Sequence, residues 1–291
     1  MSSLRKRAAS VLSRLPTNRP VSAGPACARL AGFAPAKVNL TLHVTGRRAD
    51  GYHLLDSLVA FADVGDHLTS APGDGLTVTG PFAAGVPVGD ENLIRRALRL
   101  AGSARAITLD KQLPHPAGLG GGSSDAAAAL RLVGADLPVG DLLALGADVP
   151  VCAIGRGARM RGIGDRVTPV TLPPLHAVLV NPGLSVATPQ VFAALETSRN
   201  AGMDDLPGWA DTDALIDWLI AQRNDLEGPA ITVAPDIVGV LGAIRATGAA
   251  VTRMSGSGAT CFGLYPDVAA AKAGATRLAR PGWWVRACVL S

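Results

Sequence analysis

A glycine cluster directly before an alanine-rich segment is the strongest chemical signal in this sequence. Residues 114–130 read PHPAGLGGGSSDAAAAL. The cluster comprises Gly118, Gly120, Gly121 and Gly122. Glycine loses the most conformational entropy on folding, so this density indicates a backbone that bends sharply or that another group approaches closely. A helix N-terminus exposes unpaired N–H groups, so we predict a phosphate-binding loop before a helix over residues 123–133, with a tight structural turn as the alternative.

The polar residues after the glycines fit the same interpretation. Ser123 or Ser124 can cap the helix, and either hydroxyl can also face a phosphate or its metal ion. Asp125 suits the first turn, where the helix dipole favours negative charge. No Gly-Lys-Ser/Thr follows the glycines, and Ser123 stands where a GxGxxG loop needs its last glycine. The two commonest phosphate-loop families are therefore excluded.

Lys37 and Asp148 are the charged residues whose surroundings stand out. Lysine is scarce here and arginine plentiful, yet Lys37 lies in the apolar stretch KVNLTLHV. The alternative to a functional role for Lys37 is a solvated strand edge. Asp148 in LGADVP fits a helix N-cap with Pro150 just inside the helix. A residue that caps a helix can also face a cleft.

The elements that must position these residues follow no regular alternation. KVNLTLHV, residues 37–44, alternates apolar and polar residues as a half-buried strand does. We expect further strands in residues 65–80, 104–114, 175–182, 259–266 and 283–290, and further helices in residues 91–102, 211–222, 235–248 and 267–279. Without the rhythm of a doubly wound sheet, this order predicts an α+β fold in two domains, residues 31–172 and 173–291.

Composition favours a soluble protein without a nucleic-acid partner. The chain has 291 residues, 48% of them hydrophobic and 17% charged, which is typical of a core-forming protein. No apolar run approaches the roughly 18 residues that a membrane helix needs. The net charge of +4 comes largely from the first thirty residues, and aromatics, at 4%, offer few platforms for base stacking. A binding module for nucleic acid therefore stays a minor alternative.

The N-terminus and the cysteines add two expectations. Residues 1–30 are rich in Arg, Ser and Ala and lack acids, as organelle transit peptides do. We favour a disordered extension or an early start codon over a targeting role. The four cysteines are Cys27, Cys152, Cys261 and Cys288. They form no CxxC pair, which favours buried free thiols in a reducing cytoplasm over disulfides or zinc.

Three further segments join the glycine loop in a pattern that resembles the GHMP kinases, the family of galactokinase, homoserine kinase and mevalonate kinase. They are APAKVNLTLHVTGRRADGYHLLDSLV, LGADVPVCAIG and RMSGSGATCFGLY, at residues 34–59, 145–155 and 253–265. KVNLTLHVTGRRADGYH is the specific part. It resembles the branch that phosphorylates the 2-hydroxyl of a cytidine-diphosphate-linked sugar alcohol for isoprenoid synthesis. The resemblance runs from about Phe33 to the C-terminus.

The resemblance implies an architecture and partners. An N-terminal ATP-binding domain would resemble the second domain of a small-subunit ribosomal protein, and the C-terminal domain would be ferredoxin-like. The active site would lie between them, with ATP as co-substrate and Mg²⁺ accompanying it, although no carboxylate pair looks like a dedicated metal cage. The expected partner is a small molecule, with no nucleic acid and no membrane. We expect a cytoplasmic monomer or weak homodimer.

The resemblance also implies catalytic and nucleotide-binding residues. Lys37 would pair with Asp148, the base, and stabilise charge on the transferred phosphate. Asn92 and Lys111 would line the adenosine pocket. The residues expected to bind the phosphates are Pro114, Ala117, Gly118, Leu119, Gly120, Gly121, Gly122, Ser123 and Ser124.

The acceptor site is implied in the same way. Asn39, on the same strand face as Lys37, would bond the acceptor. Tyr52 and His53 would recognise the cytosine, and Phe192 would cover its other face with Thr188 nearby. From sequence alone, Phe192 fits a core position and His53 an exposed turn. The acceptor residues expected in SGSGAT are Gly256, Ser257 and Gly258. A tight hairpin turn is the alternative for that segment.

One departure from the family pattern concerns the entry of the glycine loop. His115 and Pro116 stand where small residues are usual. Proline lacks an N–H donor, so it either weakens ATP binding or merely stiffens the loop entry. Mevalonate or homoserine kinases remain alternatives, but their acceptors do not need the DGYH segment. In a nucleic-acid-binding module, Lys37, Asp148 and the glycine loop would have no joint purpose.

Overall fold

A computed structural model describes residues 30–291. Except for Leu30, the extension expected over residues 1–30 lies outside the described residues, and so does Cys27. The first half contains β1 (Leu30–Asn39), β2 (His43–Arg47), β3 (His53–Pro72), β4 (Leu76–Thr79), α1 (Leu93–Leu100), β5 (Arg105–Asp110), α2 (Gly121–Leu132), α3 (Val139–Leu145), α4 (Val149–Ile154), β6 (Ala158–Gly162) and β7 (Arg166–Pro169). The second half contains β8 (Leu175–Asn181), α5 (Thr188–Ala193), α6 (Thr212–Ile220), α7 (Glu227–Val233), α8 (Ile237–Arg245), β9 (Val251–Met254), β10 (Cys261–Tyr265), α9 (Val268–Leu278) and β11 (Trp284–Leu290). Every segment expected to be a strand or helix contains one of that type.

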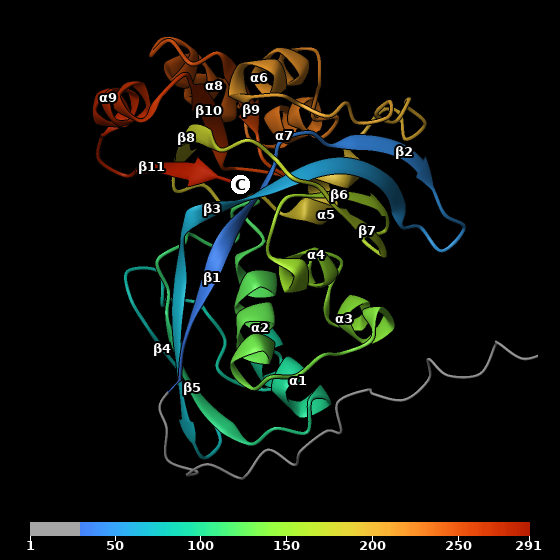
Figure 1. Cartoon of the computed structure of the whole chain (residues 1–291), viewed down its shortest axis with the longest axis vertical. Helices are drawn as coiled ribbons and strands as arrows, with labels where there is room; N and C mark the ends of the chain where they lie inside the picture. The colour runs from blue at the N-terminus through green and yellow to red at the C-terminus, as the bar shows by residue number, and fades with distance from the viewer. Residues whose placement is uncertain (1–29) are drawn as a thin grey trace, which may run out of the picture.

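The long strand β3 connects the two halves. It pairs with β1, β2, β5 and β6 on the N-terminal side and with β11 on the other, so one sheet runs through the described chain (Figure 1). At the junction, the N–H groups of Phe61 and Ser291 each donate to the other residue's carbonyl, at 2.9 and 3.0 Å. The C-terminus is thereby joined to the first half. The expected domain boundary at residue 172 stays a prediction.

The C-terminal half has a ferredoxin-like arrangement. Its strands lie in the order β11-β8-β10-β9, all antiparallel, with helices between β8 and β9 and α9 between β10 and β11. This βαββαβ connection confirms the expected class of fold for the second half. In Figure 1, α6, α8 and α9 lie at the top of the molecule, far from α1 and α2, whereas α5 lies near its middle, above α4.

In the N-terminal half, helix α2 lies at the centre. It packs on β1, with α1 and α4 beside it (Figure 1). Residues 124–130 of α2 are all buried, including the run from Ala126 to Ala129. Alanine has no side-chain entropy to lose and no bulk, so neighbouring elements can approach this helix closely from several sides. The alanine-rich sequence therefore explains why the helix after the glycine loop is held rigidly.

The expected strand over residues 37–44 is divided in the structure. β1 ends at Asn39 and β2 begins at His43, and both Leu40 and Thr41 donate their N–H groups to Leu58 at 2.8 and 3.3 Å. Leu42 pairs instead with Asn224 of the second half. The expected half-burial is also wrong, because residues 36–44 are buried on both faces. The strand lies between two layers, which an alternating pattern does not indicate.

The cysteines of the described chain agree with the expectation of free thiols. Cys152, Cys261 and Cys288 are buried and unpaired. Burial raises the pKa of each thiol well above its usual range. A thiol that stays protonated is a poor nucleophile, so these side chains serve packing. No helix in residues 30–291 is both long and apolar enough to cross a bilayer.

Two helical glycines give opposite predictions for stability. An alanine Cβ at Gly274 of α9 would lie 2.7 Å from the hydroxyl oxygen and 2.8 Å from Cζ of the buried Tyr265, whereas one at Gly242 of α8 meets nothing within 4 Å. Overpacking costs about 1–3 kcal/mol, and an alanine replacing an open helical glycine stabilises by about 0.5–1 kcal/mol. We expect Gly274→Ala to lower the free energy of unfolding in urea and Gly242→Ala to raise it. Equal shifts would contradict this packing.

Candidate active site

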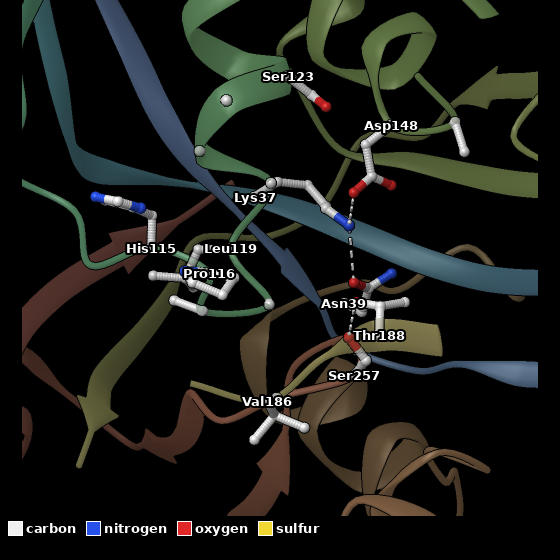
Figure 2. A pocket seen from close by; sticks show the side chains of 18 of the residues that line it. Lys37, Asn39, His115, Pro116, Leu119, Ser123, Asp148, Val186, Thr188 and Ser257 are labelled. Carbon is white, nitrogen blue, oxygen red and sulfur yellow. Dashed lines mark hydrogen bonds and ion pairs between the residues drawn. The ribbon is translucent and has the colours of Figure 1, made fainter. Parts of the chain in front are cut away.

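A cavity of about 440 Å³ lies where the two halves meet. Its walls come from the end of β1, the glycine loop before α2, the start of α4 and the loop between β9 and β10. Figure 2 shows these segments converging around Lys37. Four stretches that lie far apart in sequence thus supply one site.

Lys37 and Asp148 form an ion pair in this cavity. The Lys37 ammonium lies 2.9 Å from Oδ2 of Asp148 (Figure 2), and the side chains are 4% and 31% exposed. Asp148 occupies the N-cap position of α4, with Pro150 in the first turn, but its carboxylate accepts no hydrogen bond from the helix. The expected pairing is therefore confirmed, and the carboxylate faces the cavity instead of capping.

A chain of hydrogen bonds holds Lys37 from the other side. Its ammonium donates to Oδ1 of Asn39 at 2.9 Å, and Nδ2 of Asn39 donates to Oγ of Ser57 at 2.8 Å. Oγ of Ser57 donates in turn to the carbonyl of Thr41 at 2.5 Å. Because the acceptor and one donor of the Asn39 amide are occupied, its orientation is fixed. The buried cation thus has both a charged and a polar partner.

The glycine loop presents N–H groups to the cavity. Gly118 and Gly120 have φ of +72° and +61°, and α2 begins at Gly121. The carbonyls of Gly118 and Leu119 accept from Oγ of Ser255 at 2.9 Å and from the N–H of Lys37 at 2.9 Å. Within residues 30–291, no hydrogen bond is donated by the backbone N–H groups of residues 120–123. The loop is therefore anchored through its carbonyls, and its donors stay available to an anion.

The serines after the glycines do not behave as expected. The N-cap of α2 is Gly120, so neither Ser123 nor Ser124 caps the helix. Oγ of Ser124 donates to the carbonyl of Pro35 at 2.7 Å, and the side chain is fully buried outside the cavity. The helix starts earlier than the sequence predicts, and this turns Ser124 towards β1. Ser123 does line the cavity.

The second glycine loop faces the first. Gly256 and Gly258 have φ of +58° and +87°, and Oγ of Ser257 lies 2.8 Å from Oγ1 of Thr188. A Cβ at Gly118 would collide with the carbonyl of Ser255, so the two loops touch backbone to backbone. Glycine at 118 is therefore required by a protein contact as well as by its conformation. A phosphate cannot be the whole reason for the glycines.

A small pocket of about 190 Å³ continues from the glycine loop. It shares Leu93, His115 and Gly122 with the main cavity and includes the expected Asn92 and Lys111. Asn92 caps α1 by accepting from the N–H of Ile94 at 2.8 Å and donates to the carbonyl of Pro87 at 2.7 Å. Its side chain shapes the pocket through the backbone it holds.

Lys111 belongs to a buried cluster with two aspartates. Its ammonium lies 2.5 Å from Oδ2 of Asp66 and 2.8 Å from Oδ2 of Asp125, and all three side chains are at most 4% exposed. Asp66 also accepts from the N–H groups of Gln112 and Leu113 at 2.6 and 2.8 Å. Oδ1 of Asp125 has no hydrogen-bond partner within the described part of the chain. Two carboxylates thus share one ammonium, and Asp125 has fewer hydrogen bonds than Asp66.

The pKa values in this cluster follow from the presence of two buried carboxylates around one ammonium. Burial raises the pKa of Asp125 to about 7, with Lys111 opposing the rise and Asp66 adding to it. Burial alone would lower the pKa of Lys111, but the two carboxylates raise it overall. A proton on Asp125 lets the buried cluster stay neutral. The expectation that Asp125 lies in the first helix turn is wrong, because α2 begins at Gly121 and has no acid in its first turn, and the sequence contained no sign of this cluster.

An aromatic cavity of about 840 Å³ adjoins the main one. It shares Leu55, Ala147, Thr188 and Phe192 with the main cavity. Phe192 lies against His53, with ring centroids 4.7 Å apart and planes at 19°, so the imidazole covers one face of the phenyl ring.

Tyr52 and Arg47 also line this cavity. Tyr52 is 61% exposed. Burial and the nearby Arg47 lower the pKa of His53, which keeps its imidazole neutral at pH 7.

Taken together, the three cavities contain every predicted site residue except Ser124. Pro116 also lines the main cavity, and Nε2 of His115 lies 2.9 Å from the carbonyl of Phe82. Sequence analysis missed Ser57 and Ser255. Ser255 begins the SGSG segment and was accessible to motif analysis, whereas nothing in its local pattern marks Ser57. No group of three or more His, Cys, Asp or Glu side chains in the described range could hold a metal ion.

The family model of the GHMP kinases N terminal domain matches residues 91–166, and that of the GHMP kinases C terminal matches residues 213–282. The 4-diphosphocytidyl-2-C-methyl-D-erythritol kinase of Dinoroseobacter shibae is 56% identical over 289 residues, which cover 95% of this chain and 97% of that protein. The kinase of the same name from Paracoccus denitrificans is 54% identical over 263 residues, covering 89% and 96%.

A solved structure is similar over nearly the same range. A crystal structure of 4-(cytidine 5'-diphospho)-2C-methyl-D-erythritol kinase is 39% identical and superimposes with a TM-score of 0.73. The match covers 90% of this chain and 99% of that one. The fold is therefore that of the GHMP kinases.

The Asp66–Lys111–Asp125 cluster predicts a pH dependence of stability. Asp125 has a pKa of about 7 when folded, against about 3.9 when unfolded. Between these values only the folded chain holds the proton, so this group's contribution to stability falls as pH rises to 7 and is constant above it. We expect the free energy of unfolding of wild type, minus that of Asp125→Asn, to decline from pH 4.5 to 7 in urea denaturation. A difference that rises over that range would overturn the assignment.

Proposed function

The chain belongs to the 4-diphosphocytidyl-2-C-methyl-D-erythritol kinase family within the GHMP kinases, and we propose that it transfers the γ-phosphoryl group of ATP to the 2-hydroxyl of that cytidylated acceptor. The products would be the 2-phosphate and ADP, in the non-mevalonate route to isoprenoid precursors. Membership makes the chain a small-molecule kinase with ATP as co-substrate. The observation that carries the choice of acceptor is the aromatic cavity, which adjoins the Lys37–Asp148 cavity and shares four lining residues with it.

Asp148 is the proposed base. Its carboxylate takes the proton of the acceptor hydroxyl while that oxygen bonds to the γ-phosphorus and the bond to the β-phosphate oxygen breaks. The bonding electrons of the broken bond leave with ADP. The partial exposure of Asp148 supports this role, because a hydroxyl can reach the carboxylate from the cavity. Lys37 orients Asp148 from below at 2.9 Å and adds positive charge where the transferred group gains negative charge.

The nucleotide is proposed to lie along the glycine loop. The free N–H groups of residues 120–123 would bind phosphate oxygens, and the base would enter the small pocket between Leu93 and Lys111. Mg²⁺ would neutralise phosphate charge when bound. Among the described residues, no group of three or more His, Cys, Asp or Glu side chains could hold a metal, so the ion would be held mainly by the phosphates. Ser123 lines the main cavity and would offer its hydroxyl to the ion. Pro116 precedes these donors and would stiffen the loop entry.

The acceptor is proposed to span both larger cavities. Tyr52, His53 and Phe192 would bind the cytosine, and Asn39, Thr188 and residues 256–258 would bind the groups near the reacting hydroxyl. A neutral imidazole suits hydrogen bonding to an uncharged base. His53 now covers one face of Phe192, so the base would use the other face or part the two rings. The proposed protein is cytoplasmic and is a monomer or a weak homodimer. Each chain would consist of two domains, residues 31–172 and 173–291.

The first experiment compares acceptors. Purified protein is incubated with Mg-ATP and 4-diphosphocytidyl-2-C-methyl-D-erythritol, mevalonate, homoserine or no acceptor, and ADP is measured. We expect turnover with the cytidylated acceptor alone. Asp148→Asn should lower kcat by a factor of about 10²–10⁴, the usual contribution of a general base. Asp141→Asn, an exposed acid in the first turn of α3, is the control and should keep wild-type kcat. Turnover with mevalonate or homoserine would refute the proposed acceptor.

Gly122 allows a test of the nucleotide site without disturbing the fold. An alanine Cβ there meets only Cδ1 of Leu93, at 3.7 Å, and Gly122 lines both the main cavity and the small pocket. We expect Gly122→Ala to keep the melting temperature of wild type. By obstructing the phosphates, it should raise KM for ATP at least about fivefold, and a fivefold change in affinity corresponds to about 1 kcal/mol. KM for the acceptor should stay within twofold. An unchanged KM for ATP would place the phosphates elsewhere.

A further inference from the structure

Arg253 is a buried cation with no carboxylate at salt-bridge distance in the described chain, although Glu227, which accepts from the N–H of Met254, acts on it from further away. It lies in β9, is 7% exposed, and no salt bridge joins it to an acid within residues 30–291. Nη1 donates to the carbonyl of Leu40 at 2.7 Å, and Nη2 donates to those of Leu219 and Gln222 at 2.9 and 2.7 Å. Burial lowers the pKa of Arg253 to about 10, so it stays charged at pH 7. A buried cation is costly, so its three carbonyl partners need a reason.

The three carbonyls come from both halves of the described chain. Leu40 directly follows Asn39, at the end of the strand that carries Lys37. Leu219 and Gln222 lie at the end of α6, where the helix dipole favours a cation. Arg253 itself stands two residues before the second glycine loop. One guanidinium therefore connects the catalytic strand, α6 and the loop of residues 255–258.

Further hydrogen bonds join the same segments. Nδ2 of Asn224 donates to the carbonyls of Met254 and Gly256, each at 2.8 Å. The N–H of Asn39 donates to Oγ of Ser255 at 3.0 Å, and this hydroxyl donates to the carbonyl of Gly118 at 2.9 Å. The second glycine loop is thus tied both to the strand of Lys37 and to the first glycine loop. Arg253 adds a charged, three-carbonyl contact at the base of that arrangement.

We propose that Arg253 is a positioning residue, which sets the spacing between the Lys37–Asn39 strand and the loop of residues 255–258. It touches none of the three cavities, so it acts through these two segments. The inference rests on the proposed function, because the aligned groups are the acceptor hydroxyl and Asp148. Misplacement of reacting groups by about 1 Å can cost about 100-fold in rate.

Arginine suits this role better than lysine. Its planar guanidinium holds two nitrogens in a fixed geometry and here reaches three carbonyls, whereas one ammonium on a flexible stem keeps the charge without that geometry. Arg253→Lys therefore tests the geometry, and Arg253→Met removes charge and geometry together. Arg277 is a matched control, since its guanidinium also binds two carbonyls at a helix end, those of Ala246 and Thr247 at 2.8 and 3.3 Å, in an exposed position.

The experiment measures kcat and both KM values for wild type, Arg253→Lys, Arg253→Met and Arg277→Met, together with their melting temperatures. We expect Arg253→Lys to lose about 10- to 100-fold in kcat, with KM for ATP within twofold, because the nucleotide loop keeps its own anchors. Arg277→Met should keep kcat within twofold. A wild-type kcat in Arg253→Lys would overturn the inference, and so would a loss confined to KM for ATP.

A second comparison covers the case in which Arg253→Met fails to fold. Ser255→Ala removes the hydroxyl that joins the two glycine loops, and it is combined with Arg253→Lys. If both residues set the same spacing, the fold-loss in kcat caused by Arg253→Lys should be smaller in the Ser255→Ala background. Independent, multiplying losses would overturn the inference. Absence of acceptor-dependent ADP in wild type would instead refute the proposed function, so the two failures are distinguishable.

Discussion

The buried ammonium of Lys37 is the constraint on which the rest of the site depends. A lysine with 4% side-chain exposure needs a charged partner and hydrogen-bond acceptors, and these come from Asp148 before α4 and from Asn39 on its own strand. Each partner is held by further contacts, down to Ser57 on β3. Satisfying one cation therefore fixes the places of β1, β3 and α4 around the cavity.

The two glycine loops show a second constraint, the close approach of backbones. The carbonyls of the first loop accept hydrogen bonds from Lys37 and Ser255, and the N–H groups of the first helix turn are left without a protein acceptor among residues 30–291. The alanine-rich helix behind it packs tightly on β1. The same arrangement that forms a protein interface between the halves thus leaves N–H donors of the first helix turn without a protein acceptor in the described chain. The close packing of the two glycine loops and the free N–H donors are two consequences of one geometry.

Charge is distributed unevenly around this centre. In the main cavity one carboxylate faces Lys37, whereas beside the small pocket two carboxylates share Lys111 in a buried cluster. Arg253 has three backbone carbonyls as hydrogen-bond acceptors, with Glu227 acting on it from further away. Within residues 30–291, three buried cations are thus stabilised in three different ways. Lys37 has one carboxylate, Lys111 has two, and Arg253 has backbone carbonyls. Each solution joins segments that are distant in sequence.

The sequence alone indicated the elements that it predicted and the α+β class, because glycine clusters and hydrophobic periodicity are local signals, whereas most candidate site residues came from its resemblance to the GHMP kinases. Tertiary structure decided what no local pattern contains. It turned Ser124 away to Pro35, divided the strand of residues 37–44, and placed His53 on Phe192. It also brought Asp66 and Asp125 to one lysine and Arg253 to three carbonyls. A buried polar group takes whichever partners packing brings within reach, and that depends on contacts across the whole chain.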